Sequence, residues 1–375
     1  MSNGMLKKYY QFELGQVCSR LSSGKGIAAK EISEHGIYPV FGGNGLRGYS
    51  DKKNFEGQCA IIGRQGAFCG NVRFFSGEAY MTEHAVVVCA NEKSDIKYLS
   101  YLLGTMNLGR LSGQSAQPGL SVKTLSKQVI QLPDISEQRQ ITKVLSSFDD
   151  KIELNAQINH NLEEQLYALY ASNYDNLSGK KVPLKECCSF QEGYVNPTQT
   201  KPEYFDGSVK WLRAVDINES FIISTSRTLT EQGFASAGKS ALLFPKDSIA
   251  ISKSGTIGRL GIVADNMCGN RAVINIVPKQ KKWLAFIYCY LKSRQAEFSD
   301  LAVGSVQKNL YVSILEPLEI FSPADSVLND FHFSAQTILE KMKNNCFEMQ
   351  SLAQLRDALL PKLMSGEIDV SEVEV

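Results

Sequence analysis

Features that would place a chain in or across a membrane are missing from this sequence. Its longest apolar run, Trp283 to Leu291, is less than half of the ~20 residues that a membrane-spanning helix needs, so we expect a buried helix there. Residues 1–16 contain no apolar stretch beside a basic start, which argues against a secretory signal. The nine cysteines are odd in number and form no CxxC motif, which indicates reduced thiols. We therefore predict a cytoplasmic protein with no membrane partner.

Catalytic and metal-binding patterns are scarce as well. Four dispersed histidines and no Cys/His cluster predict no metal site. There is no P-loop, and chain order favours no Ser/His/Asp or Cys/His arrangement. Pro133 and Asp134 with Asp149 and Lys151 resemble a nuclease pattern, but Asp149 and Lys151 fall inside an expected helix, where no metal-binding strand pair forms. We predict a chain that is not itself an enzyme.

One glycine-rich segment has the spacing of two cofactor-binding motifs. Gly43, Gly45 and Gly48 satisfy GxGxxG, and Phe41 with the first two satisfies the FxGxG of S-adenosylmethionine sites. The following residues, YSDKKNF, open no amphipathic helix, and the Asn/Asp-Pro-Pro-aromatic tetrapeptide of amino-methyltransferases is absent. We predict no cofactor in this chain. An adenine methyltransferase that uses the FGGNG segment is the enzymatic alternative.

The sequence does contain an internal repeat at a fixed shift of 190 positions. Residues of the first half return in the second as the pairs Gln117 and Gln307, Leu120 and Leu310, Val122 and Val312, Leu125 and Leu315, Ile130 and Ile320, and Pro133 and Pro323. The same shift then relates Asn155 to Asn345 and Leu162 to Leu352. The duplicated unit is a globular part followed by a long helix, and a protein built twice usually contacts something twice.

Charge is segregated in step with this repeat. Residues 1–135 carry 15 Lys and Arg against 10 Asp and Glu, and residues 178–323 carry 18 against 13. The segments 136–177 and 324–375 are acidic instead, with 3 basic against 7 acidic and 4 against 9 side chains. Basic domains on an acidic frame suit a polyanion such as DNA or RNA, although such an excess is also common in domains of this size.

Both acidic segments have the apolar spacing of a coiled-coil helix. In 136–177 the seam positions alternate four and three residues apart, namely Ile141, Leu145, Phe148, Ile152, Asn155, Asn159, Leu162, Leu166 and Leu169. The second seam consists of Leu328, Phe331, Ala335, Ile338, Met342, Asn345, Met349, Leu352, Arg356 and Leu359. Asp134 and Glu137 indicate a capping box at the first helix, and Pro361 should kink or end the second. The economical partner of each stripe is the other copy.

Asn155 and Asn345 occupy equivalent, central places in these helices. If the helices run antiparallel about a pseudo-twofold axis, the two amides would meet and fix the register, whereas the plainer alternative is that both face water. A helix of about 37 residues is ~55 Å long, so it would act as a spacer. Two globular domains on it would then face DNA one to two helical turns apart, at ~34 Å per turn.

The globular segments show short β-rich runs broken by glycine and one short helix each. The expected strands are 38–41, 60–62 and 85–89 in the first segment, with 248–252 and 272–277 in the second, and the expected helices are 98–103 and 283–291. We predict an α+β fold. It consists of two mixed α/β domains, 1–135 and 178–323, joined by two long helices that form an antiparallel coiled coil.

The candidate DNA contacts lie in loops that recur in both halves. Arg64 and Lys253 each stand two residues before a glycine, and a cation beside a glycine turn suits a phosphate. Gln65 or Ser254 would bond a phosphate or a base edge. For one copy alone, a hairpin turn with a solvated cation would be the better interpretation. Weaker candidates in loops or at strand ends are Gln117, Gln307, Arg47, Arg73, Lys308, Tyr194, Asn196 and Arg213.

The sequence resembles the specificity subunit of type I restriction-modification systems over nearly its whole length. The resemblance is carried by YPVFGGNGLRGY (38–49), IIGRQGAFCGNV (61–72), ISEQRQITKVLSSFDDKIELN (135–155), ISKSGTIGR (251–259), GSVQKNL (304–310) and LRDALLPKLMSGEI (355–368). One departure is Arg356, which stands in the seam where the first copy has Leu166.

This resemblance implies two target-recognition domains, each reading one half of a split double-stranded DNA sequence, held apart by the two helices. It also implies partners: two methyltransferase subunits docked on the helices and restriction subunits with ATP-driven translocation. S-adenosylmethionine, ATP and Mg²⁺ would belong to those partners. Apart from the methyltransferase, the rival hypothesis is a scaffold whose domains hold proteins, and it predicts no sequence-selective protection of DNA.

Overall fold

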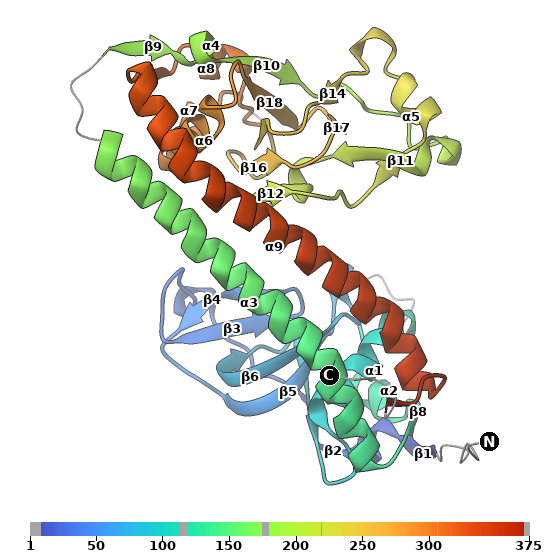
Figure 1. Cartoon of the computed structure of the whole chain (residues 1–375). Helices are drawn as coiled ribbons and strands as arrows, with labels where there is room; N and C mark the ends of the chain where they lie inside the picture. The colour runs from blue at the N-terminus through green and yellow to red at the C-terminus, as the bar shows by residue number, and fades with distance from the viewer. Residues whose placement is uncertain (1–8, 113–118, 175–179, 219, 306, 371–375) are drawn as a thin grey trace. The chain divides into compact units, whose positions relative to one another are not determined.

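The computed structural model describes residues 9–112, 119–174, 180–218, 220–305 and 307–370 (Figure 1). The chain divides into two compact units. Unit 1 comprises Met1–Asp150 and Leu352–Val375, and unit 2 comprises Lys151–Ser351. The long helices α3 (Ile135–Tyr174) and α9 (Asp325–Ser365) each contribute residues to both units.

Unit 1 is built on a six-stranded sheet with the strand order β2-β7-β5-β6-β3-β4. Neighbouring strands are antiparallel except β3 and β6, which are parallel. The strands are β2 (Cys18–Ser23), β3 (Tyr38–Gly42), β4 (Gly45–Ser50), β5 (Phe55–Gly63), β6 (Val72–Met81) and β7 (Ala85–Ala90). A separate pair joins β1 (Tyr10–Glu13) to β8 (Val129–Leu132), and the helices are α1 (Ile96–Thr105) and α2 (Val122–Ser126).

The interior strand β7 is apolar without a break because both of its faces are covered. Val86 and Val88 belong to the core that includes Leu99 of α1, whereas Ala85 and Val87 belong to a second cluster on the other face. Alternate residues of a strand point to opposite faces, so a strand covered on both sides needs apolar residues at every position. The predicted strands 38–41, 60–62 and 85–89 and the helix 98–103 are confirmed.

Unit 2 contains a five-stranded sheet with the order β10-β18-β15-β16-β12. Only β12 and β16 are parallel within it. The strands are β10 (Cys188–Glu192), β12 (Phe221–Ile222), β15 (Ile249–Ser252), β16 (Leu260–Val263) and β18 (Val273–Pro278). A further pair joins β9 (Lys181–Pro183) to β19 (Glu319–Phe321), and the helices are α4 (Leu184–Cys187), α5 (Glu231–Ala235), α6 (Trp283–Ser293), α7 (Phe298–Leu301) and α8 (Val312–Leu315).

A second sheet in unit 2 has the order β13-β11-β17-β14. Its strands are β11 (Phe205–Leu212), β13 (Thr228–Leu229), β14 (Leu243–Phe244) and β17 (Met267–Gly269). The apolar run predicted as a buried helix is α6, in which Ala285 to Leu291 are all buried. The strands expected at 248–252 and 272–277 are β15 and β18. Both units are therefore mixed α/β, as the sequence predicts.

The two units share one arrangement of strands. The order β2-β7-β5-β6 in unit 1 matches β10-β18-β15-β16 in unit 2, and all neighbours in both sets are antiparallel. In each unit a helix follows the central strand, α1 after β7 and α6 after β18. The match extends one strand further, because β3 is parallel to β6 as β12 is parallel to β16; beyond that strand, unit 1 adds β4 and unit 2 adds the second sheet. The duplication thus covers the core of each unit and not its additions.

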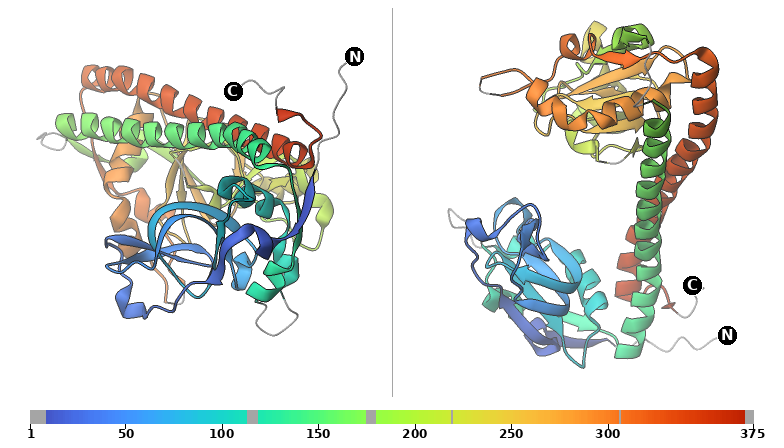
Figure 2. Two further views of the ribbon diagram at one scale, coloured as in Figure 1. Left: turned by 90° about the horizontal axis from the view of Figure 1, so that it is seen from below. Right: turned by 90° about the vertical axis from the view of Figure 1, so that its left-hand side faces the viewer.

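Helices α3 and α9 run side by side (Figure 2), and every predicted seam position in them is buried or half-buried. In unit 2, Tyr170 contacts Phe331 and Asn159 contacts Asn345, so residue numbers fall on α3 as they rise on α9, and the pair is antiparallel. In unit 1, Arg356 pairs with Asp149, which explains how a cation is tolerated at a seam position.

The predicted pairing of Asn155 with Asn345 is wrong in its partner. Both residues are buried, but Asn345 Nδ2 donates to Asn159 Oδ1 at 2.8 Å, while Asn155 Nδ2 donates to Glu348 at 2.9 Å. Asn159 in turn donates to the Met342 carbonyl at 3.1 Å. The register is offset by about one helical turn, because packing along the seam, rather than the midpoint of each helix, sets which residues face each other.

The start of α3 and the region of Pro361 in α9 test two expectations from the sequence. The Asp134 carboxylate accepts a hydrogen bond from the Glu137 N–H at 3.0 Å, as the capping pattern predicts. Helix α9 continues past Pro361 to Ser365, so the proline does not end it. Asp149 and Lys151 lie inside α3, which removes the nuclease-like pattern from consideration.

Candidate nucleic-acid interface

In unit 1, the loop between β5 and β6 holds the first predicted contacts. The Arg64 N–H donates to the His84 carbonyl at 3.0 Å, and the Arg64 carbonyl accepts from the Leu120 N–H at 2.9 Å. Gly66 has φ +77, a left-handed conformation that favours glycine. The backbone of Arg64 is therefore fixed on both sides, while its side chain makes only a long contact, with Nη1 3.5 Å from Ser23 Oγ.

Unit 2 repeats this geometry. The Lys253 N–H donates to the Ala272 carbonyl at 2.7 Å, and the Lys253 carbonyl accepts from the Leu310 N–H at 2.9 Å. Gly255 has φ +76, almost the value of Gly66. In both units a backbone hydrogen bond thus joins the loop that carries the cation, which we call the cation loop, to the leucine three residues after the predicted glutamine. Gln117 itself lies outside the described residues.

The glycine-rich turn of unit 1 is surrounded by predicted cations. A Cβ built on Gly45, which has φ +100, would lie 1.9 Å from Nη1 of Arg73, and one on Gly42 would lie 2.7 Å from Cδ of Arg47. One on Gly43 would lie 3.5 Å from the backbone N of Arg64. These glycines make room for arginine side chains in the hairpin of β3 and β4. They do not form the strand-to-helix turn that a dinucleotide site requires.

The unit 1 cluster, defined as Arg47, Arg64, Gln65 and Arg73, therefore lies around one turn. Arg47 and Arg73 are exposed, and no ion pair within the described part of the chain involves either of them. Uncompensated guanidinium groups on β4 and at the start of β6 suit contacts to phosphate or to base edges.

In unit 2, Lys253 is paired rather than free. Its Nζ lies 3.2 Å from both carboxylate oxygens of Glu192, and the two side chains are only 15% and 21% exposed. The ammonium also lies 5.1 Å from the centre of the Tyr311 ring. Tyr194 donates its hydroxyl to Glu192 at 2.8 Å. We call Glu192, Tyr194, Lys253 and Tyr311 the Lys253 cluster. The sequence analysis missed Glu192 because it is 61 residues away from Lys253.

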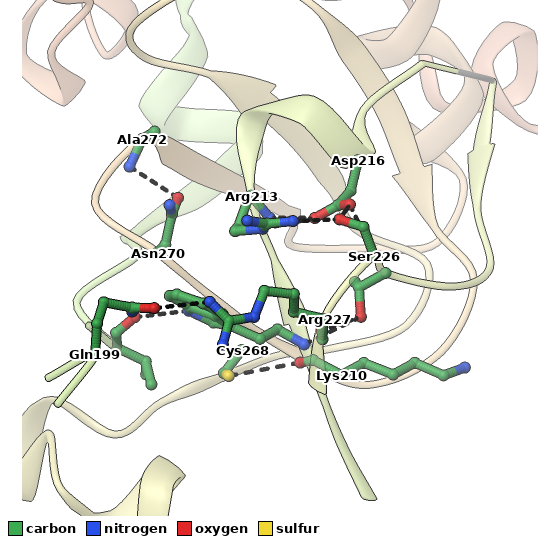
Figure 3. A network of polar contacts seen from close by, with 12 residues as sticks. Gln199, Lys210, Arg213, Asp216, Ser226, Arg227, Cys268, Asn270 and Ala272 are labelled. Atoms are coloured by element: carbon green, nitrogen blue, oxygen red, sulfur yellow. Dashed lines mark hydrogen bonds and ion pairs between the residues drawn. The ribbon is translucent and has the colours of Figure 1, made fainter. Parts of the chain in front are cut away.

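The other predicted residues of unit 2 differ in their surroundings. Asn196, Gln307 and Lys308 are exposed, and Ser254 is half-buried. Arg213 has local partners, because its Nη2 donates to Ser226 and its Nε lies 3.7 Å from the buried Asp216 carboxylate. Figure 3 shows Arg213 turned toward these two residues. This local pairing holds a loop together, and the role of Arg213 as a DNA contact stays a prediction.

Two arginines of unit 2 that the repeat does not single out, Arg227 and Arg259, lie where a ligand could contact them. Arg227 lies over the aromatic ring of Phe205. Arg259 lines a cavity of about 450 Å³ together with Lys292 and Gln295. Neither has a counterpart at the 190 shift, so a search guided by the repeat could not select them. The local signal for Arg259 is its place at the end of the SGTIGR segment.

The thiols are unsuited to chemistry at this surface. All nine cysteines are free. Burial raises the pKa of the Cys59 and Cys268 thiols to about 12, so they stay protonated at neutral pH. Across the described residues, no group of three or more His, Cys, Asp or Glu is placed to hold a metal ion. Nor does any helix among them have the length and apolar content to cross a membrane.

These observations define a class of protein: a duplicated α+β chain with paired long helices and a cation-bearing loop at the same place in each copy. The family model described as "Type I restriction modification DNA specificity domain" matches residues 7–164 and again 179–347. The chain therefore belongs to the type I restriction-modification DNA specificity family.

Individual relatives agree with this assignment. The chain is 28% identical over 306 residues to the MjaIX specificity subunit of Methanocaldococcus jannaschii, covering 74% of this chain and 70% of that one. It is 42% identical over 140 residues to the EcoprrI specificity subunit of Escherichia coli, which is 36% of this chain and 35% of that protein. The fold resembles the crystal structure of a type I S subunit from M. genitalium, with a TM-score of 0.59, 18% identity and coverage of 97% and 98%.

Proposed function

We propose that the two α/β domains of this type I specificity subunit each read one half of a bipartite DNA target. The observation that carries the proposal is the loop connection repeated in both units, from Leu120 to Arg64 and from Leu310 to Lys253. A common core presents a cation loop twice, while the added strands differ. Base-specific contacts must differ between two half-sites, whereas the frame that holds them need not.

Residues contact DNA in this proposal as two separate sets. In unit 1 they are the unit 1 cluster with Gln117, and in unit 2 they are Lys253, Ser254, Gln307, Lys308, Tyr194 and Asn196. For Lys253 to reach a phosphate, the ammonium must share or leave the Glu192 carboxylate. For Arg213 to reach DNA, its guanidinium must likewise share or leave Ser226 and Asp216.

Methylome sequencing of cells that express the full chain with its methyltransferase tests the proposal. We expect one bipartite modified motif. Arg64→Ala should relax one half of that motif and Lys253→Ala the other, because each residue lies in a different unit. No motif, or an equal loss in both halves from either variant, would contradict the assignment.

Docking of two methyltransferase subunits on the helices is part of the proposal. Large apolar side chains stay exposed on them, among which Phe333 is 80% and Leu355 53% exposed. Exposed apolar residues on an acidic helix suit a protein partner better than DNA. Phe333→Ser should reduce co-purification of the methyltransferase, whereas the exposed polar change Gln157→Ser on α3 should not. Restriction subunits would join this complex through the methyltransferases.

The chemistry of modification and cleavage belongs to those partners in this proposal. S-adenosylmethionine, ATP and Mg²⁺ would bind there, and this chain would be non-catalytic. Supporting this, the FGGNG segment is a strand hairpin filled by arginine side chains. Calorimetric titration of the isolated chain with S-adenosylmethionine should give no binding. Saturable binding that Gly43→Val abolishes would favour the methyltransferase alternative instead.

A further inference from the structure

Unit 2 carries a sheet for which unit 1 has no counterpart. Strands β11, β13, β14 and β17 form it around a small apolar cluster that includes Phe205, Trp211 and Leu229. Most of the sheet comes from the segment between β10 and β15, where the two units diverge. Any base contact made only by unit 2 is expected in such an addition.

Arg227 is held flat on this sheet. Its guanidinium carbon lies 4.0 Å from the centre of the Phe205 ring and 5.9 Å from that of Trp211. Nη1 donates to Oε1 of Gln199 at 2.7 Å, and Figure 3 shows the side chain extended toward that amide. Stacking and one hydrogen bond together fix the plane of the guanidinium and its rotation within the plane.

The other edge of this guanidinium, formed by Nε and Nη2, has no bonded partner among the described residues. No hydrogen bond to Nε or Nη2 of Arg227, and no ion pair of its side chain, occurs among the residues that the structure describes. Arg213, which directly follows β11, offers a contrast, since its Nη2 donates to Ser226 and its Nε lies 3.7 Å from the Asp216 carboxylate (Figure 3). Arg294 offers another, because it lies over Tyr290 with Nε and Nη2 both bonded to Glu297.

Arg227 is connected to the Lys253 cluster through one segment of chain, because its partner Gln199 lies seven residues after Glu192. Gln199, which holds it, belongs to the segment 193–200 that carries the exposed Tyr194 and Asn196. That segment follows β10, whose last residue is Glu192, the partner of Lys253. One stretch of chain thus leads from the loop shared by both units to the open arginine of unit 2.

We propose that Arg227 reads a guanine in the half-site recognised by unit 2. The free Nε and Nη2 form a planar fork that matches O6 and N7 of guanine in the major groove. A phosphate would accept the same fork, but phosphate contacts carry no sequence information and need not differ between the units. This inference rests on the proposed function, because it assumes that unit 2 reads one half-site.

Methylome sequencing of the full chain with its methyltransferase separates the possible outcomes. We expect Arg227→Ala to relax one G·C position in one half of the motif by roughly 10- to 100-fold, with the other half unchanged. Arg227→Gln should shift that position toward adenine, which glutamine pairs with bidentately. Arg294→Ala is the matched control, since its fork is already occupied, and it should leave the motif unchanged.

Other results would overturn the inference. A wild-type motif without any G·C pair in its two halves overturns it with no variant needed. An unchanged motif with uniformly lower modification in Arg227→Ala would show a phosphate or structural role, provided that thermal unfolding of the variant matches the wild type. Absence of any wild-type motif would overturn the proposed function itself, which distinguishes the two failures.

Discussion

Asn345→Ala should destabilise unit 2 although it deletes only one side-chain donor. Asn345 is 1% and Asn159 7% exposed, and the 2.8 Å bond between them satisfies Oδ1 of Asn159 inside the seam. Removing the donor leaves that oxygen buried without its partner, which costs about 1–3 kcal/mol. Asn159→Ala should cost a similar amount. The double variant should cost at least ~1 kcal/mol less than the sum, because no unpaired amide then remains.

Urea unfolding followed by tryptophan fluorescence measures this coupling in the full chain. Both tryptophans of the sequence, Trp211 and Trp283, belong to unit 2, so the signal reports that unit. Gln157→Ala is the control, since Gln157 is exposed on α3 and its amide donates to the Glu153 carboxylate at 3.1 Å. It should change stability by less than ~0.5 kcal/mol. Single-variant costs that add to within ~0.3 kcal/mol would refute the asparagine pairing.

Three further predictions follow from the two clusters and the thiols. Glu192→Gln frees Lys253 and should strengthen binding to DNA of any sequence, with a salt dependence steeper by about 0.9 in log–log slope; an unchanged slope in titrations at several salt concentrations would count against a phosphate role. Gly45→Val should displace Arg73 and relax one half of the methylated motif, whereas Gly57→Val, equally strained at φ +117 but with nothing within 4 Å of its Cβ, should not. Desolvation by burial raises the pKa of the Cys18 and Cys59 thiols from 9.0 to about 12, so that above pH ~9 only the unfolded chain loses these protons, and the free energy of unfolding should fall as pH rises from ~9 toward 12. If a Cys18→Ala/Cys59→Ala variant shows the same fall with pH in urea unfolding, this explanation is contradicted.

The sequence predicts what is local or repeated and misses what depends on distant pairing. Strands such as β7 and the buried helix α6 follow from continuous apolar runs, and the two cation loops follow from their recurrence. The bond from Asn345 to Asn159 does not, because each seam fixes a face of its helix but not the register between helices. The salt bridge of Lys253 with Glu192 joins the ends of β15 and β10, which flank β18 in the sheet and are far apart in sequence, so only the strand order reveals it.

The offset between equivalent residues of the two units is not the same along the whole repeat. Leu120 and Leu310 bond equivalent carbonyls at an offset of 190 positions, but the Cys18 thiol contacts the Leu14 carbonyl as Cys188 contacts that of Leu184, at an offset of 170. Unit 2 is therefore about 20 residues longer between β10 and β15 than unit 1 is between β2 and β5, and this longer segment contains Arg227 and three of the four strands of the second sheet. A shared core with unequal additions favours half-sites that differ in the bases read or in length, because the added strands alone bring new donors to one unit. The bipartite motif should accordingly be asymmetric, and a palindromic motif would show that these added strands read no bases.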